Sequence, residues 1–246
     1  MSALAIDRVR TDISPDDTMF EGDRDHYFSV GRSALECIRL AMSAGSIPTF
    51  RNILDFGCGF GRVMRVLRAA FPGAEIAACD VDRRAVDYCS ETFDAEPLYS
   101  DENPAYIRIP RAFNLIWCGT LLTNVAAPQF IRFLELLHSS LLPGGLLVFT
   151  AHGPFVAERI RSRQCTYGLD EAAVPDLLQE YDAAGFGYLN YSGDVLARLH
   201  LSRYGISVCR PSWILERIEQ LPHSRVLMYT ERAWDNHQDS IAFLRG

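Results

Sequence analysis

Residues 55–62, which read DFGCGFGR, are the part of the sequence whose residue types and spacing most clearly indicate chemistry. They stand between a short apolar run at 53–56 and an amphipathic helical pattern that begins at Val63. Glycines in such a turn let the backbone bend tightly and approach a ligand closely. The N-terminus of the helix that follows favours a negative group, such as a carboxylate. We therefore predict a ligand-binding loop at 57–61.

The spacing of the glycines separates this loop from the dinucleotide-binding type. The dinucleotide fingerprint is Gly-x-Gly-x-x-Gly, whereas this loop reads Gly-x-Gly-x-Gly, and Arg62 stands where the last dinucleotide glycine would be. Asp55 precedes the loop, and a carboxylate there suits an ammonium group and not a pyrophosphate. Asp80 ends the second apolar run, where an acidic side chain is placed to bind ribose hydroxyls. Both acidic residues are therefore candidate ligand contacts.

Apolar strand patterns and helical patterns alternate along the chain, which is typical of a parallel sheet covered by helices. The strand patterns lie at 53–56, 75–80, just before Ser100, at 113–118 and at 146–150. Two more, at 225–230 and 240–244, are joined by a linker too short for a crossover helix, so we expect them to be antiparallel. The sequence therefore predicts an α/β fold with a seven-stranded, mostly parallel sheet whose last strand is antiparallel.

We divide the chain into an N-terminal arm and helix at 1–45, a core at 46–150, an insertion at 151–210, and a C-terminal helix and strands at 211–246 that complete the core. The first 26 or so residues are polar and acidic, which is typical of a loosely held arm. The insertion breaks the alternation and carries helical patterns and an aromatic cluster. That cluster would either contact a ligand or form the insertion's own small core, and it comprises Tyr181, Phe186, Tyr188, Tyr191 and Tyr204.

Composition excludes several classes of function. The net charge of −7 gives no electrostatic footprint for nucleic acid, and we interpret Arg62, Arg65 and Arg68, which recur at helical spacing, as a solvated helix face. Seven cysteines without a Cys-x-x-Cys pair favour reduced thiols in a cytoplasmic protein. No signal-peptide pattern and no apolar run near the roughly 20 residues of a membrane span is visible, so we expect no membrane partner.

The segments ILDFGCGFGR, ACDVD, FNLIWCGTLLTN and LLPGGLLVFT, in this order, resemble the ordered motifs of class I S-adenosylmethionine (SAM)-dependent methyltransferases. The resemblance runs from residue 53 to 150 and resumes in the last two strand patterns. It implies a Rossmann-like sheet with helices on both faces and a small helical cap. It implies SAM as the cofactor, and a cofactor site at Asp55, Gly57, Cys58, Gly59, Gly61, Asp80, Val81, Ser100, Asp101 and Cys118.

The same resemblance implies a role for each part of this site. The 57–61 loop would hold the amino-acid end of the cofactor, Asp80 the ribose hydroxyls, and Val81 the adenine. Ser100 or Asp101 would lie near the adenine, and Cys118 would border the methionine part. The segment at 27–28 would close over the cofactor. Relatives often have a histidine where this chain has Asn124, which puts a catalytic base at that position in doubt.

Methyl transfer by in-line displacement needs a positioned acceptor, exclusion of water and, for some acceptors, a base. His152 follows the fifth strand pattern and His237 precedes the last, so both fall at the sheet edge where ligands bind. Each is a candidate base, and each would equally serve as a local hydrogen-bonding residue. His200 and His223 are interpreted as ordinary polar positions. We predict no metal site.

The resemblance favours an enzyme that methylates oxygen or nitrogen of a small molecule or glycan. The 151–210 insertion would then be the acceptor cap. A protein acceptor stays open, and the sequence does not indicate the oligomeric state. Two alternatives are a nucleotide-dependent oxidoreductase, which the glycine spacing disfavours, and a non-catalytic module that keeps the fold and binds the cofactor, which the intact loop and Asp80 disfavour.

Overall fold

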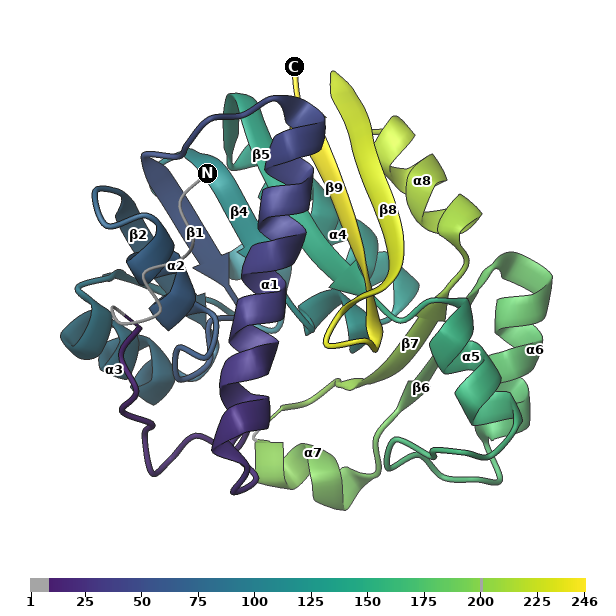
Figure 1. Ribbon diagram of the computed structural model, residues 1–246. Helices are drawn as coiled ribbons and strands as arrows, with labels where there is room; N and C mark the ends of the chain where they lie inside the picture. Colours follow the sequence, from purple (N-terminus) through teal and green to yellow (C-terminus); the bar gives the residue numbers. More distant parts are fainter. Residues whose placement is uncertain (1–8, 200) are drawn as a thin grey trace.

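The computed structural model describes residues 9–199 and 201–246 (Figure 1). The first eight residues of the predicted arm, and His200, lie outside this part of the chain.

A seven-stranded sheet forms the centre of the molecule, in the order β3-β2-β1-β4-β5-β9-β8. Its strands are β1 (Asn52–Phe56), β2 (Glu75–Asp80), β3 (Glu96–Tyr99), β4 (Phe113–Cys118), β5 (Leu141–Ala151), β8 (Ser224–Trp234) and β9 (Gln238–Arg245). The first five pair in parallel, and β9 pairs antiparallel with both β5 and β8. The predicted mostly parallel sheet with an antiparallel last strand is confirmed.

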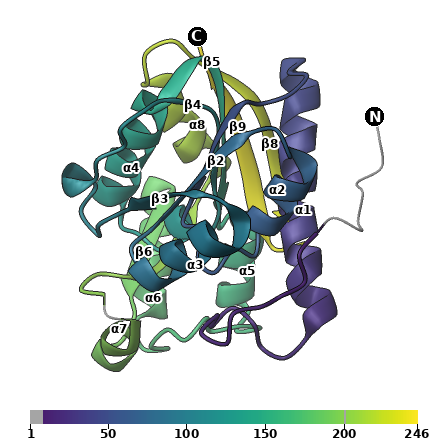
Figure 2. The same cartoon turned by 90° about the vertical axis from the view of Figure 1, so that its left-hand side faces the viewer.

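Helices cover both faces of this sheet (Figure 2). On one side lie α1 (Arg24–Gly45), α2 (Met64–Ala70) and α3 (Arg83–Phe93), and on the other α4 (Ala127–Ser139) and α8 (Pro211–Glu219). Alternate strand residues enter the two apolar cores: Ile53 packs with the first group of helices, and Leu54 with the second. Side chains alternate along β1 with a period of two. This alternation determines which side chains at the end of the strand face a helix layer and which can face a ligand.

The fifth strand begins earlier than its apolar pattern predicts. Leu141 already pairs with Phe113, and regular pairing resumes at Leu146 opposite Leu115, so the intervening Pro-Gly-Gly forms an irregularity within β5. Gly144 has a φ of +73°, which a glycine adopts without strain. The Pro-Gly-Gly segment therefore lies inside the strand and does not precede it.

Residues 151–210 contain α5 (Pro154–Arg161), α6 (Val174–Ala184), β6 (Phe186–Asn190), α7 (Gly193–Leu199) and β7 (Gly205–Cys209). The helices match the predicted helical cap. In addition, β6 and β7 form a two-stranded antiparallel sheet that was not predicted from the sequence. This segment has an apolar cluster of its own, which includes Val156, Leu177 and Val208. Two strands of five residues each give too short an alternation to be recognised by pattern.

The arginines at helical spacing do not form a solvated face, so that interpretation is wrong. Arg65 is 1% exposed, and its guanidinium donates to the carbonyl oxygens of Arg10 and Asp12, both at 2.8 Å. Arg68 donates to the carbonyl oxygens of Phe93 (2.9 Å), Ala74 (2.8 Å) and Asp94 (2.7 Å). These side chains donate to backbone carbonyls outside the sheet, and Arg65 thereby holds the described part of the arm on the core.

Within the described residues, no helix combines the length and the apolar character needed to cross a membrane.

Candidate functional site

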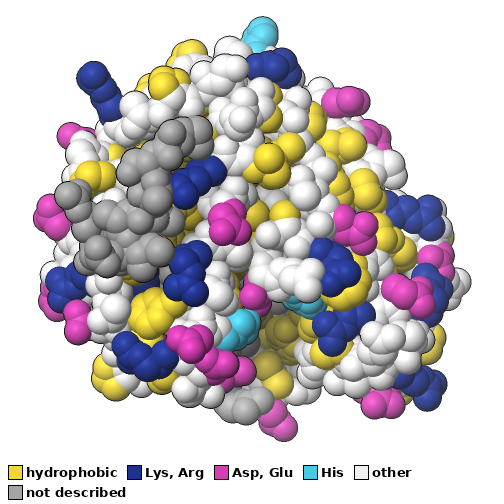
Figure 3. Space-filling view, in the orientation of Figure 1, with side chains coloured by type: hydrophobic (Ala, Val, Ile, Leu, Met, Phe, Trp, Pro, Cys, Tyr) yellow, Lys and Arg dark blue, Asp and Glu magenta, His cyan; other side chains and the backbone are white. Residues whose placement is uncertain are grey.

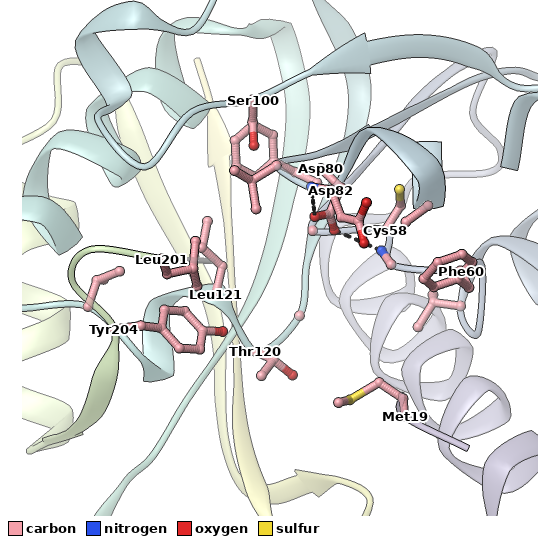
Figure 4. A pocket seen from close by; sticks show the side chains of 18 of the residues that line it. Met19, Cys58, Phe60, Asp80, Asp82, Ser100, Thr120, Leu121, Leu201 and Tyr204 are labelled. Atoms are coloured by element: carbon pink, nitrogen blue, oxygen red, sulfur yellow. Dashed lines mark hydrogen bonds between the residues drawn. The ribbon is translucent and has the colours of Figure 1, made fainter. Parts of the chain in front are cut away.

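A cavity of about 320 Å³ lies at the carboxyl ends of β1, β2 and β4. The 57–61 loop forms one wall, and Asp80 and Ser100 continue it toward β3 (Figure 4). Residues between 117 and 133 form another part of the lining. Distant parts of the chain add to it, namely the arm at 17–19, the segment at 201–204 and Trp234. In open α/β sheets this edge is where ligands bind.

The loop takes a conformation that requires its glycines. The φ angles of Gly57, Gly59 and Gly61 are +82°, +48° and +82°. The backbone N–H groups of residues 57 and 58 both donate to the carbonyl oxygen of Cys79, at 2.8 and 3.1 Å, which ties the loop to the end of β2. A Cβ on Gly61 would lie 2.4 Å from a ring carbon of Phe93, so this glycine also permits close packing of the loop on α3.

Asp80 connects the loop to the cavity. Its Oδ2 accepts from the N–H of Gly59 at 2.9 Å, and its Oδ1 accepts from the N–H of Asp82 at 3.0 Å. Burial raises the pKa of this carboxyl, while the two N–H groups act in the opposite direction. Asp82 in turn caps α3 by accepting from the N–H of Arg84 at 3.0 Å.

Asp55 lies behind the loop and not in the cavity lining. It is 1% exposed, and its Oδ2 has no hydrogen-bond partner among the described residues. Burial, with a smaller contribution from Asp80, raises its pKa to about 8. A buried carboxylate without a donor is costly, so a ligand or solvent donor at this point would stabilise the site.

Seven of the ten predicted cofactor residues line the cavity: Gly57, Cys58, Gly59, Asp80, Val81, Ser100 and Asp101. Gly61 shapes the loop from behind. Cys118 is fully buried, and it is the next residue, Gly119, that borders the cavity. Burial raises the pKa of the Cys118 thiol far above its ordinary value, so this side chain stays protonated.

Several lining residues had no local sequence signal. Asp17, Thr18 and Met19 come from the arm, and the predicted closing segment at 27–28 does not reach the cavity. The hydroxyl of Tyr27 instead donates to Asp17 at 2.6 Å and so positions the arm.

Residues 201–204, which we call the strap, are likewise held at the cavity by a contact with a distant part of the chain. The Oε2 of Glu102 accepts from the N–H of Ser202 (2.8 Å), from its hydroxyl (2.6 Å) and from the N–H of Arg203 (3.2 Å). One carboxylate oxygen thus holds the strap beside the loop that follows β3. Of the five aromatic residues in the predicted cluster, only Tyr204 lines the cavity (Figure 4), whereas Tyr181 belongs to the segment's own core.

The two candidate histidines contact each other but do not line the cavity. Their ring centroids are 5.5 Å apart, and the ring of His237 also stacks on Tyr167. His152 is buried, its Nδ1 has no partner among the described residues, and burial together with His237 lowers its pKa to about 3. His237 is half-buried, and burial lowers its pKa as well.

A short hydrogen-bond chain runs from Gln238, next to His237 in sequence, to the cavity. The residue after His237, Gln238, accepts from the hydroxyl of Thr150 at 2.6 Å. That hydroxyl accepts from the N–H of Thr120 at 2.8 Å. Thr120 lines the cavity and has a φ of +69°, which is unusual for a β-branched residue and marks a constrained site.

Comparison with known proteins gives a local match in sequence. Residues 54–147 match the family model described as a methyltransferase domain. The chain is 35% identical over 54 residues to the ribosomal RNA small subunit methyltransferase C of Photobacterium profundum. That alignment covers 22% of this chain and 16% of the relative, so it concerns only a small part of either protein.

The likeness in structure extends over most of the chain. A SAM-dependent methyltransferase from Clostridium acetobutylicum ATCC 824 superposes with a TM-score of 0.57 at 13% identity, over 93% of this chain and 94% of the other. The N-methyltransferase NodS from Bradyrhizobium japonicum WM9, solved with S-adenosyl-L-homocysteine (SAH), gives 0.52 at 14%, over 94% and 93%. At these identities the likeness establishes the fold.

Proposed function

We propose that this chain is a class I, SAM-dependent methyltransferase, and that it transfers the methyl group of SAM to oxygen or nitrogen of a small molecule or glycan by in-line displacement. One observation carries the proposal. Asp80, which lines the cavity, also accepts from the N–H of Gly59, so the acidic residue and the glycine loop act as one binding unit. SAM supplies a methyl group that its positively charged sulfur has already activated.

The residues present fit this cofactor. Asp80 would bind the ribose hydroxyls, and Val81, Ser100 and Asp101 would surround the adenine. The unpartnered Oδ2 of Asp55 would be stabilised by the ammonium group of the amino-acid end. The buried apolar side chains of the lining exclude water from the reacting centre.

We propose that residues 151–210 form the acceptor cap. The strap brings Leu201 and Tyr204 of this segment into the cavity lining. The face seen in Figure 1 is hollowed between the lower part of α1 and this segment, with hydrophobic side chains on the floor of the hollow and histidine side chains at its edge (Figure 3). A hollow of this kind supports a small acceptor, and the net charge of −7 disfavours nucleic acid.

The test of the function is calorimetric titration of the purified chain with SAH. We expect saturable binding to the wild type. Asp80→Ala should weaken it by about 10- to 150-fold, the equivalent of one hydrogen bond to a charged group. Asp87→Ala, which removes an exposed carboxylate from the same helix region, is the matched control and should leave affinity unchanged. No binding by folded wild-type protein would refute the proposal, and binding without any methyl transfer would favour the non-catalytic module.

For the base that some acceptors need, we propose His237, because it is the more exposed of the two histidines and a lowered pKa keeps its ring neutral at pH 7. His237→Ala should lower kcat/KM by about 10²- to 10⁴-fold, the usual contribution of a general base, and leave SAH affinity unchanged. His223→Asn, at an exposed position, is the control. Unchanged turnover in the His237 variant would contradict the assignment.

His152 is then a positioning residue, because it is buried and packs against the ring of the more exposed His237. Only neutral His237 accepts a proton, so activity should fall as pH drops through its pKa, which lies below the ordinary value of 6.5. His152→Ala opens space beside the ring and admits water. The acidic limb of the pH profile should therefore move up toward 6.5, which a merely structural role for His152 would not cause.

A further inference from the structure

The guanidinium of Arg62 lies in the cavity wall and has no ion-pair partner in the described part of the protein. Arg62 follows the loop directly, its side chain lines the cavity, and burial lowers its pKa. Its guanidinium makes no hydrogen bond or ion pair with any residue in 9–199 or 201–246; its one contact of note is the ring of Trp234, 5.9 Å from the guanidinium carbon. By contrast, the nearby guanidinium of Arg65 is occupied by carbonyl oxygens.

The acidic side chains around Arg62 are Asp17, Asp235 and Glu21, and none is within ion-pair distance of it. Asp17 is engaged on both oxygens, by the hydroxyl of Tyr27 at 2.6 Å and by the N–H of Met19 at 2.9 Å. Asp235 faces His26, whose Nε2 is 3.1 and 3.2 Å from its two oxygens. These carboxylates favour a cation at this point without pairing with it.

An unpaired charge that has lost much of its hydration is unfavourable until a counter-charge arrives. A guanidinium presents a planar fork of N–H donors, which matches a carboxylate. At the other end of the same loop, the Oδ2 of Asp55 lacks a donor among the described residues. The unpaired guanidinium and the unsatisfied carboxyl therefore flank one glycine loop. A zwitterionic amino-acid group would supply a carboxylate for Arg62, and its ammonium group would lower the pKa of Asp55 from about 8 and so favour the charged carboxylate.

We propose that Arg62 binds the carboxylate of the cofactor's amino-acid end and so makes the site selective for ligands that carry it. The inference rests on the proposed function. A carboxylate on the methyl acceptor is the other source of the same chemistry, and the experiment separates the two.

The experiment compares two ligands by calorimetric titration: SAH and S-adenosyl-3-thiopropylamine, which is SAH without the carboxylate. The wild type should bind SAH at least about tenfold more tightly, because a charged hydrogen bond is lost with the carboxylate. Arg62→Gln should weaken SAH binding by about 10- to 100-fold and leave the decarboxylated ligand's affinity unchanged or improved. Arg62→Lys, which keeps the charge and loses the fork, should be intermediate. Arg32→Gln, at an exposed arginine of α1 outside the cavity lining, is the matched control.

Each other outcome overturns the proposal in a recognisable way. If Arg62→Gln weakens both ligands equally while the thermal midpoint falls, Arg62 supports the loop and not the carboxylate. If SAH affinity is unchanged and only the KM of an anionic acceptor rises, the anion belongs to the acceptor. If wild-type protein binds neither ligand, the cofactor assignment fails, and the Arg62 assignment with it.

Discussion

Replacing Gly61 by Ala is expected to lower the thermal midpoint by about 5–15 °C and to eliminate SAH binding. The new Cβ would meet the ring of Phe93 at 2.4 Å and the sulfur of Cys89 at 3.2 Å, and both residues are buried. Overpacking costs about 1–3 kcal/mol, and a left-handed conformation costs a non-glycine residue about 1–2 kcal/mol more. For a chain of this size each kcal/mol corresponds to about 2–4 °C.

Gly59→Ala is the matched control for stability. Its φ of +48° is also left-handed, but a Cβ there has no neighbour within 4 Å. Only the conformational cost of about 1–2 kcal/mol remains, so its midpoint should fall by less. Equal losses of stability in the two variants, measured by calorimetry or circular dichroism, would show that packing against Phe93 does not determine the loop.

The second large effect is expected for Arg65→Met. This change removes hydrogen bonds from a buried guanidinium to the carbonyl oxygens of Gly61, Arg10 and Asp12, and fills most of the same space. Hydrogen bonds to a charged group contribute about 1.5–3 kcal/mol each and do not add fully, so we expect the free energy of unfolding to fall by about 3–5 kcal/mol.

Urea unfolding measures that free energy, and limited proteolysis shows whether the arm at 9–23 has become cleavable. Arg84→Met is the control, because the Arg84 side chain is exposed and bonds only to Asp82 among the residues described. A variant as stable as the wild type, with a protease-resistant arm, would mean that other contacts hold the arm in place.

The parts of this fold that could be predicted from sequence are those whose signal is local. Glycine spacing together with Asp55 and Asp80 located the glycine loop that lines the cavity, and short apolar runs between helical patterns located the central strands. The direction of β9 followed from the length of one linker. In each case the relevant residues lie within one strand, one turn or one strand–helix unit, where spacing alone determines which side chains share a face.

The missed features depend on contacts between distant parts of the chain. Helical spacing placed Arg65 and Arg68 on one side of α2, but it does not reveal that an arm from residues 9–23 covers that side. The strap reaches the cavity because Glu102 holds Ser202, a contact between residues 100 positions apart. The arm's acidic composition indicated loose attachment. Arg65, however, binds the backbone carbonyls of the arm, and composition gives no information about these groups.

The guanidinium of Arg65 bonds the ligand loop and the arm at once, through Gly61 on one side and Arg10 and Asp12 on the other. Opening of the arm and opening of the loop are therefore linked equilibria, and linkage is reciprocal. A ligand that stabilises the closed loop should slow amide hydrogen exchange around Arg10 and Asp12, which lie outside the cavity lining. The coupling free energy is the same in both directions, so any partner or modification that detaches the arm from the core must weaken ligand affinity. The stability of the arm and the affinity of the cavity are thus expected to change together, through one buried side chain.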